Sequence, residues 1–215
     1  MTTVAVLDYG MGNLHSVCKA LEHVSSKARV ILTSDADALL KADKIVVPGQ
    51  GAIAGCVQAL SAQGLGQALM QCLENKPYLG ICLGLQALYD SSEEGGGVDC
   101  LAVLPGRVRH FSGKMADAGE GVRLKIPHMG WNQVRQTRKH PLWHDIPQDA
   151  RFYFVHSYYA DSADNKNVAG LTQYGIEFTS VAARDNIFAV QFHPEKSQRY
   201  GLQLLENFIH WNGEA

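Results

Sequence analysis

The sequence lacks the features that mark a secreted, membrane-embedded or disulfide-stabilised protein. No apolar run approaches the roughly 18 residues that suggest a membrane-spanning helix. The first residues, Met1 to Asp8, have no basic segment followed by a long apolar one, and they are typical of a first strand rather than of a signal peptide. The five cysteines include no C-x-x-C pair, which argues against a disulfide framework or a structural zinc site. We therefore expect a cytoplasmic protein that does not associate with membranes and that holds no metal ion or cofactor.

The sequence also has little net charge. Its 19 lysines and arginines nearly balance its 21 aspartates and glutamates, so no overall positive field favours nucleic acid as a partner. Hydrophobic residues make up 46% of the 215 residues, which is enough to bury one sizeable core. Because there is no internal repeat, low-complexity tract or linker, we expect one domain over residues 1–215.

In the first half of the chain, short apolar runs alternate with amphipathic segments. This alternation predicts an α/β fold with a central, mostly parallel sheet that helices flank on both faces. The expected strands are 4–7, 29–33, 44–47 and the run before Cys82. The expected helices are one that Asn13 caps, a short one that Ser34 or Asp35 caps, and a long amphipathic region over 53–73.

Most segments of the second half are rich in β-branched and aromatic residues, and loops with Gly, Asp and Asn separate them. These features predict a more antiparallel portion of the same fold. The expected strands are 107–111, 133–137, 151–159, 168–174, 178–184 and 187–192, with a closing helix over 201–211. Residues 109–123 have the composition of a loose surface excursion.

The most informative short stretch is Gly80-Ile81-Cys82-Leu83-Gly84. It follows an apolar run and precedes a segment with a helical pattern, so Cys82 is expected at the apex of a strand–turn–helix connection. The pattern is that of the G-x-S-x-G nucleophile elbow with sulfur in place of oxygen. A helix N-terminus near the sulfur favours the reactive thiolate. The alternative is a buried, unreactive cysteine, since free cysteines are usually small core residues.

A cysteine nucleophile needs a base, and the base needs an orienting group. His193 and Glu195 follow the apolar run from Ala189 to Phe192, and side chains two positions apart in an extended segment face the same side. We therefore expect Glu195 to hold one imidazole nitrogen of His193, which leaves the other for Cys82. The alternative is a surface histidine and glutamate at a strand end.

An acyl-transfer site also needs hydrogen-bond donors for the developing oxyanion. Pro48-Gly49-Gln50-Gly51 follows the third expected strand, so the backbone of Gln50 and Gly51 is expected at the carboxyl edge of the sheet, where ligands of open α/β sheets bind. The N–H of Leu83, the residue after the candidate nucleophile, is the other expected donor. A simple glycine-rich turn is the alternative for this loop.

Together these motifs resemble the class I (triad) glutamine amidotransferases. The elbow with the following Gln86, the Phe192-His193-Pro194-Glu195 segment and the Pro48 to Gly51 loop carry this resemblance. Within the family, the chain resembles the glutaminase subunits of imidazole glycerol phosphate synthases, from histidine biosynthesis. The additional segments that resemble those subunits are Asp8 to Leu14, Pro127 to Asn132, Tyr153 to Tyr159 and His193 to Ser197.

The resemblance implies a mechanism. Cys82 would attack the side-chain amide of L-glutamine, release ammonia and form a glutamyl thioester, which water then hydrolyses. His193 would move the protons, and Glu195 would orient it. The residues that would contact glutamine are Gln86, Gly51, Ser157 and Tyr158.

The resemblance also implies a partner. Ammonia would pass to a (β/α)8 cyclase subunit, which makes imidazole glycerol phosphate and an aminoimidazole carboxamide ribotide. The chain and this cyclase would form a heterodimer, with Trp131, Tyr153 and Lys196 at the interface.

The triad by itself does not identify what receives the ammonia. A related glutaminase that serves another acceptor, such as a bacterial surface sugar, would share the triad, although the three interface residues favour histidine biosynthesis. A stand-alone γ-glutamyl cysteine hydrolase is a further alternative. The expected lack of a secretion signal and the presence of Lys196 and Trp131 count against it. A binding module without catalysis would not need an intact triad.

Overall fold

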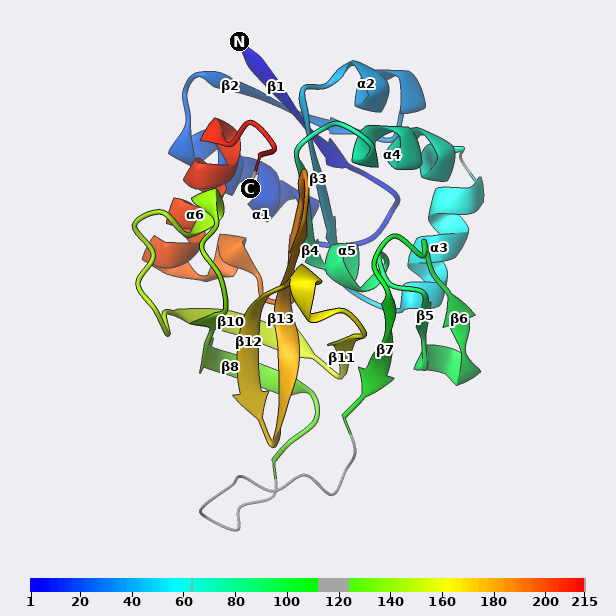
Figure 1. The fold of residues 1–215 in the computed structure, drawn as a ribbon. Helices are drawn as coiled ribbons and strands as arrows, with labels where there is room; N and C mark the ends of the chain where they lie inside the picture. Colours follow the sequence, from blue (N-terminus) through cyan, green and yellow to red (C-terminus); the bar gives the residue numbers. More distant parts are fainter. Residues whose placement is uncertain (63, 112–123, 215) are drawn as a thin grey trace.

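The computed structural model describes residues 1–62, 64–111 and 124–214 (Figure 1). Most of its strands form one large sheet. They are β1 (Thr2–Leu7), β2 (Ala28–Thr33), β3 (Lys44–Gly49), β4 (Tyr78–Cys82), β5 (Ser91–Ser92), β6 (Val98–Asp99), β7 (Gly106–His110), β9 (Arg135–Gln136), β11 (Tyr158–Ser162), β12 (Val168–Tyr174), β13 (Ile176–Arg184) and β14 (Ile187–Val190). A second, antiparallel sheet pairs β8 (His128–Gln133) with β10 (Arg151–His156).

The large sheet has a parallel half and a mostly antiparallel half. Its order is β2-β1-β3-β4-β14-β13-β11-β7-β5-β6, with β12 beside β13 and β9 beside β12. The strands from β2 to β14 are parallel, whereas β14, β13, β11 and β7 pair in antiparallel fashion. The expected fold class, a largely parallel sheet with a more antiparallel second half, is therefore confirmed.

Helices cover both faces of the parallel half. They are α1 (Leu14–Val24), α2 (Ala36–Lys41), α3 (Ile53–Ala62), α4 (Leu65–Leu73), α5 (Leu83–Gln86) and α6 (Gln198–His210). Val4 and Val6 of β1 pack in one core cluster with α1 and α6, whereas Ala5 and Leu7 pack in another with α2, α3 and α4. This alternation follows from the period of two in a strand, which sends successive side chains to opposite faces.

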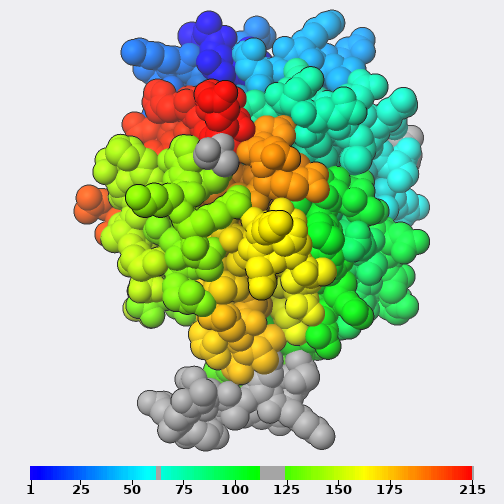
Figure 2. Space-filling view, in the orientation of Figure 1, coloured from blue at the N-terminus to red at the C-terminus, as the bar shows by residue number. Residues whose placement is uncertain are grey.

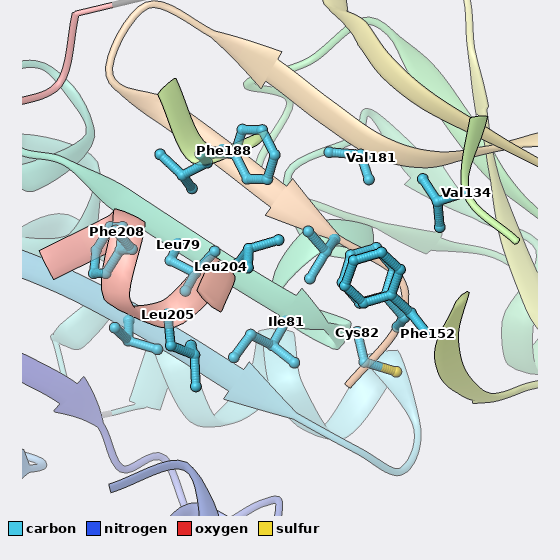
Figure 3. Packing of buried hydrophobic residues seen from close by; sticks show 14 of the residues in the cluster. Leu79, Ile81, Cys82, Val134, Phe152, Val181, Phe188, Leu204, Leu205 and Phe208 are labelled. Atoms are coloured by element: carbon cyan, nitrogen blue, oxygen red, sulfur yellow. The ribbon is translucent and has the colours of Figure 1, made fainter. Parts of the chain in front are cut away.

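The first cluster joins the closing helix to the strand that carries Cys82. Leu79 and Ile81 of β4 belong to the same core cluster as Leu204 and Phe208 of α6, and Figure 3 shows Leu79 beside this helix. All four side chains are essentially buried, and each such burial contributes about 1.5–3 kcal/mol. In the space-filling view, first-half residues and the red C-terminal helix cover the top of the molecule, and the green to orange second-half strands lie below them (Figure 2).

The second half departs from two expectations. The segment 151–159 is not one strand, because β10 ends at His156 and β11 begins at Tyr158 in the other sheet. Residues 128–133 form a strand that the sequence did not predict, and residues 133–137 divide between β8 and β9. Apolar and aromatic content alone could not locate these breaks, since each strand pairs with a segment distant in sequence.

The helix caps and the element bounds of the first half agree in part with the expectations from the sequence. Asp35 caps α2 through bonds to the N–H groups of Asp37 and Ala38, as expected, whereas Asn13 makes no side-chain cap bond to α1. The amphipathic region 53–73 divides into α3 and α4, and the strand β3 continues through Pro48 and Gly49. Residues 112–123 of the expected excursion lie outside the described residues.

Candidate active site

Cys82 lies at the carboxyl end of β4, immediately before α5 (Figure 3). Its φ of 55° is in the left-handed region, which a non-glycine residue rarely adopts and which marks a strained turn. A Cβ at Gly84 would lie 1.9 Å from the Val47 carbonyl oxygen, and one at Gly80 would lie 2.5 Å from the Gly84 carbonyl oxygen. The two glycines therefore permit a close approach of backbones that forms the elbow expected from the sequence.

His193 and Glu195 form a buried pair. Their Nδ1 and Oε1 atoms lie 2.9 Å apart, and their side chains are 4% and 2% exposed. The geometry differs from the expected one, because β14 ends at Val190 and Glu195 lies in a 3-10 turn, Pro194–Lys196. The turn, rather than an extended segment, brings the carboxylate back to the ring.

The environment of His193 favours its protonated form. Burial by itself lowers the pKa of the ring, but interactions with Cys82 and Glu195 outweigh burial and raise the pKa to about 9. Because Nδ1 is engaged with Glu195, Nε2 is the ring atom left for other contacts, and it has no hydrogen-bond partner among the described residues. The ring therefore has one nitrogen oriented by a carboxylate and the other available for proton transfer.

The candidate oxyanion segment is adjacent to the elbow. Gly49 is in register with Cys82 across β3 and β4, so Gln50 and Gly51 follow directly beyond the strand pair. Gln50 lines a small cavity, about 10 Å³, that His193 and Glu195 also line. Leu83 begins α5, where an N–H has no acceptor within the helix. The loop, the elbow and the pair thus meet at one edge of the sheet.

The structure brings together two of the residues expected to contact glutamine. The Gln86 amide nitrogen donates to the backbone oxygen of Tyr158 at 3.0 Å, so α5 and the start of β11 are joined. Ser157 precedes Tyr158 in the chain, and its carbonyl oxygen accepts the N–H of Phe111. These contacts place the segment from 157 to 158 next to the elbow helix.

The expected interface residues gather around the second sheet. Trp131 of β8 is 40% exposed, and its ring packs edge-to-face on Tyr153 of β10 at a centroid distance of 6.1 Å. Lys196 ends the 3-10 turn that holds Glu195, and its N–H donates to the His193 carbonyl oxygen. The exposed aromatic residue and the lysine therefore lie on segments that are joined to the candidate triad.

Sequence reasoning missed three residues that support the site. The Tyr9 hydroxyl donates to the Pro48 carbonyl oxygen at 2.7 Å, and the Glu94 carboxylate accepts the N–H of Ile53 at 2.8 Å. Both bonds fix the ends of the Gln50 loop. Gln191 donates to the Cys82 sulfur at 3.6 Å, and its place two residues before His193 was the signal that could have identified it.

Metal-binding clusters and membrane-spanning helices are both absent from the described part of the chain. There, no three His, Cys, Asp or Glu side chains come close enough together to hold a metal ion. Over the same residues, no helix combines the length and the apolar character that crossing a membrane requires.

Comparisons with known proteins place these features in a family. The family model for class I glutamine amidotransferases matches residues 5–211. The chain is 55% identical to the imidazole glycerol phosphate synthase subunit HisH of Pseudomonas syringae and 56% identical to that of Nitrosococcus oceani, in each case over 213 residues and 99% of both chains. The structure of PurLQS from Thermotoga maritima has a similar fold, with a TM-score of 0.72 at 17% identity, covering 97% of this chain and 98% of that one. The chain therefore belongs to the class I glutamine amidotransferase family.

Proposed function

We propose that this chain is the glutaminase of an imidazole glycerol phosphate synthase in histidine biosynthesis. Cys82, His193 and Glu195 hydrolyse the side-chain amide of glutamine, and the ammonia passes to a (β/α)8 cyclase subunit. The relatives that match over almost the whole chain bear the name of such a synthase subunit. The observation that carries the proposal is the buried pair of His193 and Glu195, whose ring keeps Nε2 for Cys82.

The first half of the reaction forms a thioester. The Cys82 sulfur attacks the amide carbon, and the amide oxygen becomes an oxyanion. This oxyanion accepts hydrogen bonds from the backbone N–H groups of Leu83 and of the segment Gln50–Gly51. The imidazolium of His193 donates a proton to the amide nitrogen, the carbon–nitrogen bond breaks, and ammonia leaves. The raised pKa of His193 supports this role, because the ring carries the required proton near neutral pH.

The second half regenerates the thiolate. His193, now neutral, takes a proton from a water molecule, whose oxygen attacks the thioester carbon. The carbon–sulfur bond breaks, glutamate leaves, and sulfur again carries the negative charge beside the protonated ring. Glu195 stabilises that ring in both halves, as the carboxylate of a triad does.

The proposed partner binds the face around Trp131, Tyr153 and Lys196. An exposed tryptophan next to a tyrosine is the kind of aromatic anchor on which interfaces depend. This face is connected to the segment that holds His193. The connection supports the proposal that the subunit hydrolyses glutamine mainly when the cyclase and its ligand are bound. Ammonia then reaches the cyclase without release to the solvent, where it would be protonated.

The experiment is a comparison of two nitrogen sources in the complex with the cyclase. Cys82→Ala is expected to abolish synthesis from glutamine and to leave synthesis from added ammonia intact. A matched control is Cys72→Ala, since Cys72 is a buried cysteine in α4 that lies outside the site. This control variant is expected to use both nitrogen sources like the unmodified chain.

Other outcomes would identify the alternatives. Loss of both activities in the Cys82→Ala variant would contradict the assignment of Cys82 as the glutaminase nucleophile. Efficient glutamine hydrolysis by the isolated chain would favour a stand-alone γ-glutamyl hydrolase. Glutamine hydrolysis that another synthase partner stimulates, but this cyclase does not, would favour a relative that serves a different acceptor.

A further inference from the structure

A chain of buried side-chain amides ends at the sulfur of Cys82. Gln191 is 0% exposed, and its Nε2 lies 3.6 Å from Cys82 Sγ. Gln86 is 3% exposed, and its Nε2 donates both to the Gln191 side-chain oxygen at 3.1 Å and to the Tyr158 backbone oxygen at 3.0 Å. The chain therefore runs from the backbone of β11, through two amides, to the candidate nucleophile.

The backbone carbonyl at one end fixes the orientation of both amides. The Tyr158 carbonyl can only accept, so the Gln86 atom facing it is the amide nitrogen rather than the oxygen. That nitrogen has a second hydrogen, which only an acceptor can satisfy, so Gln191 presents its oxygen to Gln86. The Gln191 nitrogen is then the atom left to face sulfur.

Packing alone does not require an amide at position 191. The neighbours Ala189, Val190 and Phe192 are apolar and fully buried, and the backbone N–H of Gln191 is satisfied by the Ser180 carbonyl oxygen. Burying a primary amide is unfavourable unless its polar atoms are hydrogen-bonded. The partners that offset this cost are Gln86 on one side and the sulfur of Cys82 on the other.

We propose that Gln191 holds the reacting sulfur of Cys82 through a hydrogen bond, and that Gln86 positions the Gln191 amide for this task. This inference rests on the proposed function of Cys82 as the nucleophile. The Gln191 N–H is the donor directed at the sulfur, and the His193 ring, whose pKa the interaction with Cys82 helps to raise, is a positive group in the same site. A donor and a nearby positive charge both favour the negatively charged form of a thiol. They also restrict the direction from which the sulfur meets a substrate carbon.

The test measures how fast iodoacetamide alkylates Cys82 in the complex of the full chain with the cyclase and its ligand, without glutamine. Mass spectrometry of the digested protein reports each cysteine separately, so the partly exposed Cys18 and Cys100 serve as internal standards in the same molecule. The variants are Gln191→Met, which keeps the side-chain length but removes the donor, and Gln191→Glu, which replaces the amide nitrogen with an acceptor oxygen. Rates are measured from about pH 6 to about pH 9, the range in which perturbed thiols ionise.

In the unmodified chain, Cys82 is expected to react faster than the two standards near neutral pH. Gln191→Met is expected to slow Cys82 by about tenfold there, the lower range for loss of a hydrogen bond to a charged group. The rates of variant and unmodified chain should converge at high pH, where the thiolate forms without help. A variant that changed only access to the sulfur would instead be slower by the same factor at every pH.

Two further variants keep the test decisive. Ser180→Ala removes a buried hydroxyl that has no hydrogen-bond partner within the described part of the chain, beside the backbone of Gln191. It is expected to leave the Cys82 rate unchanged. Gln86→Met leaves Gln191 without its orienting partner, so a smaller decrease than that of Gln191→Met is expected. If Gln191→Met does not fold, as judged by circular dichroism, Gln191→Glu decides the question.

The outcomes separate this inference from the function on which it rests. If Cys82 in the unmodified chain reacts no faster than Cys18 and Cys100, its role as the nucleophile is contradicted, and this inference fails with it. If Cys82 is selectively reactive and the folded Gln191 variants keep the same rate and pH profile, the inference alone is overturned. An unchanged rate in Gln86→Met would remove Gln86 from the mechanism and leave Gln191 in it.

Discussion

The backbone N–H of His193 donates to the carbonyl oxygen of Tyr153 at 2.9 Å. The N–H of Tyr153 in turn donates to the hydroxyl of Ser197, and that hydroxyl donates to the His193 carbonyl oxygen. Strand β10 and the turn that carries Glu195 are thus closed into a ring of hydrogen bonds. Trp131, whose exposed ring packs on Tyr153, is therefore linked through Tyr153 to the segment that holds His193.

The first prediction concerns this face. Trp131→Ala is expected to weaken cyclase binding by about 2 kcal/mol, as loss of an aromatic anchor does. Lys196→Ala is expected to reduce the stimulation of glutamine hydrolysis by the cyclase and its ligand. Calorimetric titration of the cyclase measures the first effect, and steady-state assays with and without cyclase measure the second.

A matched control exists for Trp131 on another element. Met70 in α4 is also 40% exposed, yet it lies on a helix of the parallel half, so Met70→Ala should leave cyclase binding unchanged. Equal losses in the Trp131 and Met70 variants would count against a specific interface. Unchanged affinity and stimulation in the Lys196→Ala variant would remove Lys196 from it.

The second prediction concerns the carboxylate of the candidate triad. Glu195→Gln removes the negative charge that, together with Cys82, raises the pKa of His193 to about 9. The pKa of the ring should fall, and kcat for glutamine should decrease by about two to four orders of magnitude with little change in KM. The measurement is the pH dependence of kcat, together with the ring chemical shifts of His193.

Glu177→Gln provides the comparison for Glu195→Gln. Glu177 is a half-exposed carboxylate that pairs with Arg135 at 2.6 Å, so the same chemical change occurs outside the site. This control should retain kcat and the same pH profile. If Glu195→Gln also retained them, Glu195 would not be the orienting group.

Much of this candidate site could be predicted because its residues lie in short sequence motifs. The elbow around Cys82 and the pair of His193 and Glu195 depend on local glycines and on a spacing of two residues. The contact of Gln191 with Cys82 could not be predicted, because a single glutamine does not form a recognisable motif. Its proposed role depends on which atom of its side-chain amide faces the sulfur. That orientation is set by Gln86 and Tyr158, which are distant in the sequence.

The fold could be predicted best where local patterns decide it. The alternation of Val4, Ala5, Val6 and Leu7 between two core clusters is a property of any buried strand. The division at Ser157 was not predictable in the same way, because the residues on either side are equally suited to strands. Before Ser157, β10 pairs with β8, and after it, β11 pairs with β7. Both pairings depend on tertiary packing.

The third prediction concerns the close packing beneath Cys82. Gly84→Ala would place a Cβ 1.9 Å from the Val47 backbone oxygen, and no flexible side chain can relieve this contact. We expect a loss of about 1–3 kcal/mol of stability, as for overpacked cores, together with a large loss of glutamine hydrolysis because the elbow must move. Denaturant unfolding and a glutaminase assay check the two effects.

Gly66 gives the opposite expectation for the same substitution. It lies in α4, and a Cβ there would meet its nearest atom at an ordinary contact distance of 3.5 Å. Gly66→Ala should therefore stabilise the protein by up to about 1 kcal/mol, as alanine does within a helix, and should keep its activity. A Gly84→Ala variant as stable and active as the Gly66→Ala variant would contradict the account of the elbow.

The last prediction concerns acid stability. Burial keeps three histidines neutral, with pKa values lowered from 6.5 to about 4 for His128 and His140 and to about 3 for His156. Below about pH 6.5 the three rings bind protons in the unfolded chain but stay neutral in the folded chain. Their contribution to the free energy of unfolding is therefore fully present above pH 6.5 and is lost as the pH falls towards 4. His193 acts in the opposite direction, because its raised pKa gives stability that is lost as the pH rises towards 9.

The melting temperature should therefore be highest near pH 6.5 and should fall on both sides. His140 lies outside the candidate site, and its ring packs against Phe188 and Trp211, so it can be replaced without a change to the candidate triad. His140→Asn loses packing, which lowers the melting temperature at every pH. The additional decrease in melting temperature below pH 6.5 should be smaller than in the unmodified chain, because one fewer group gains a proton on unfolding. Calorimetric scans at a series of pH values measure this slope, and an acid decrease as steep as that of the unmodified chain would exclude His140 as a source of the acid sensitivity.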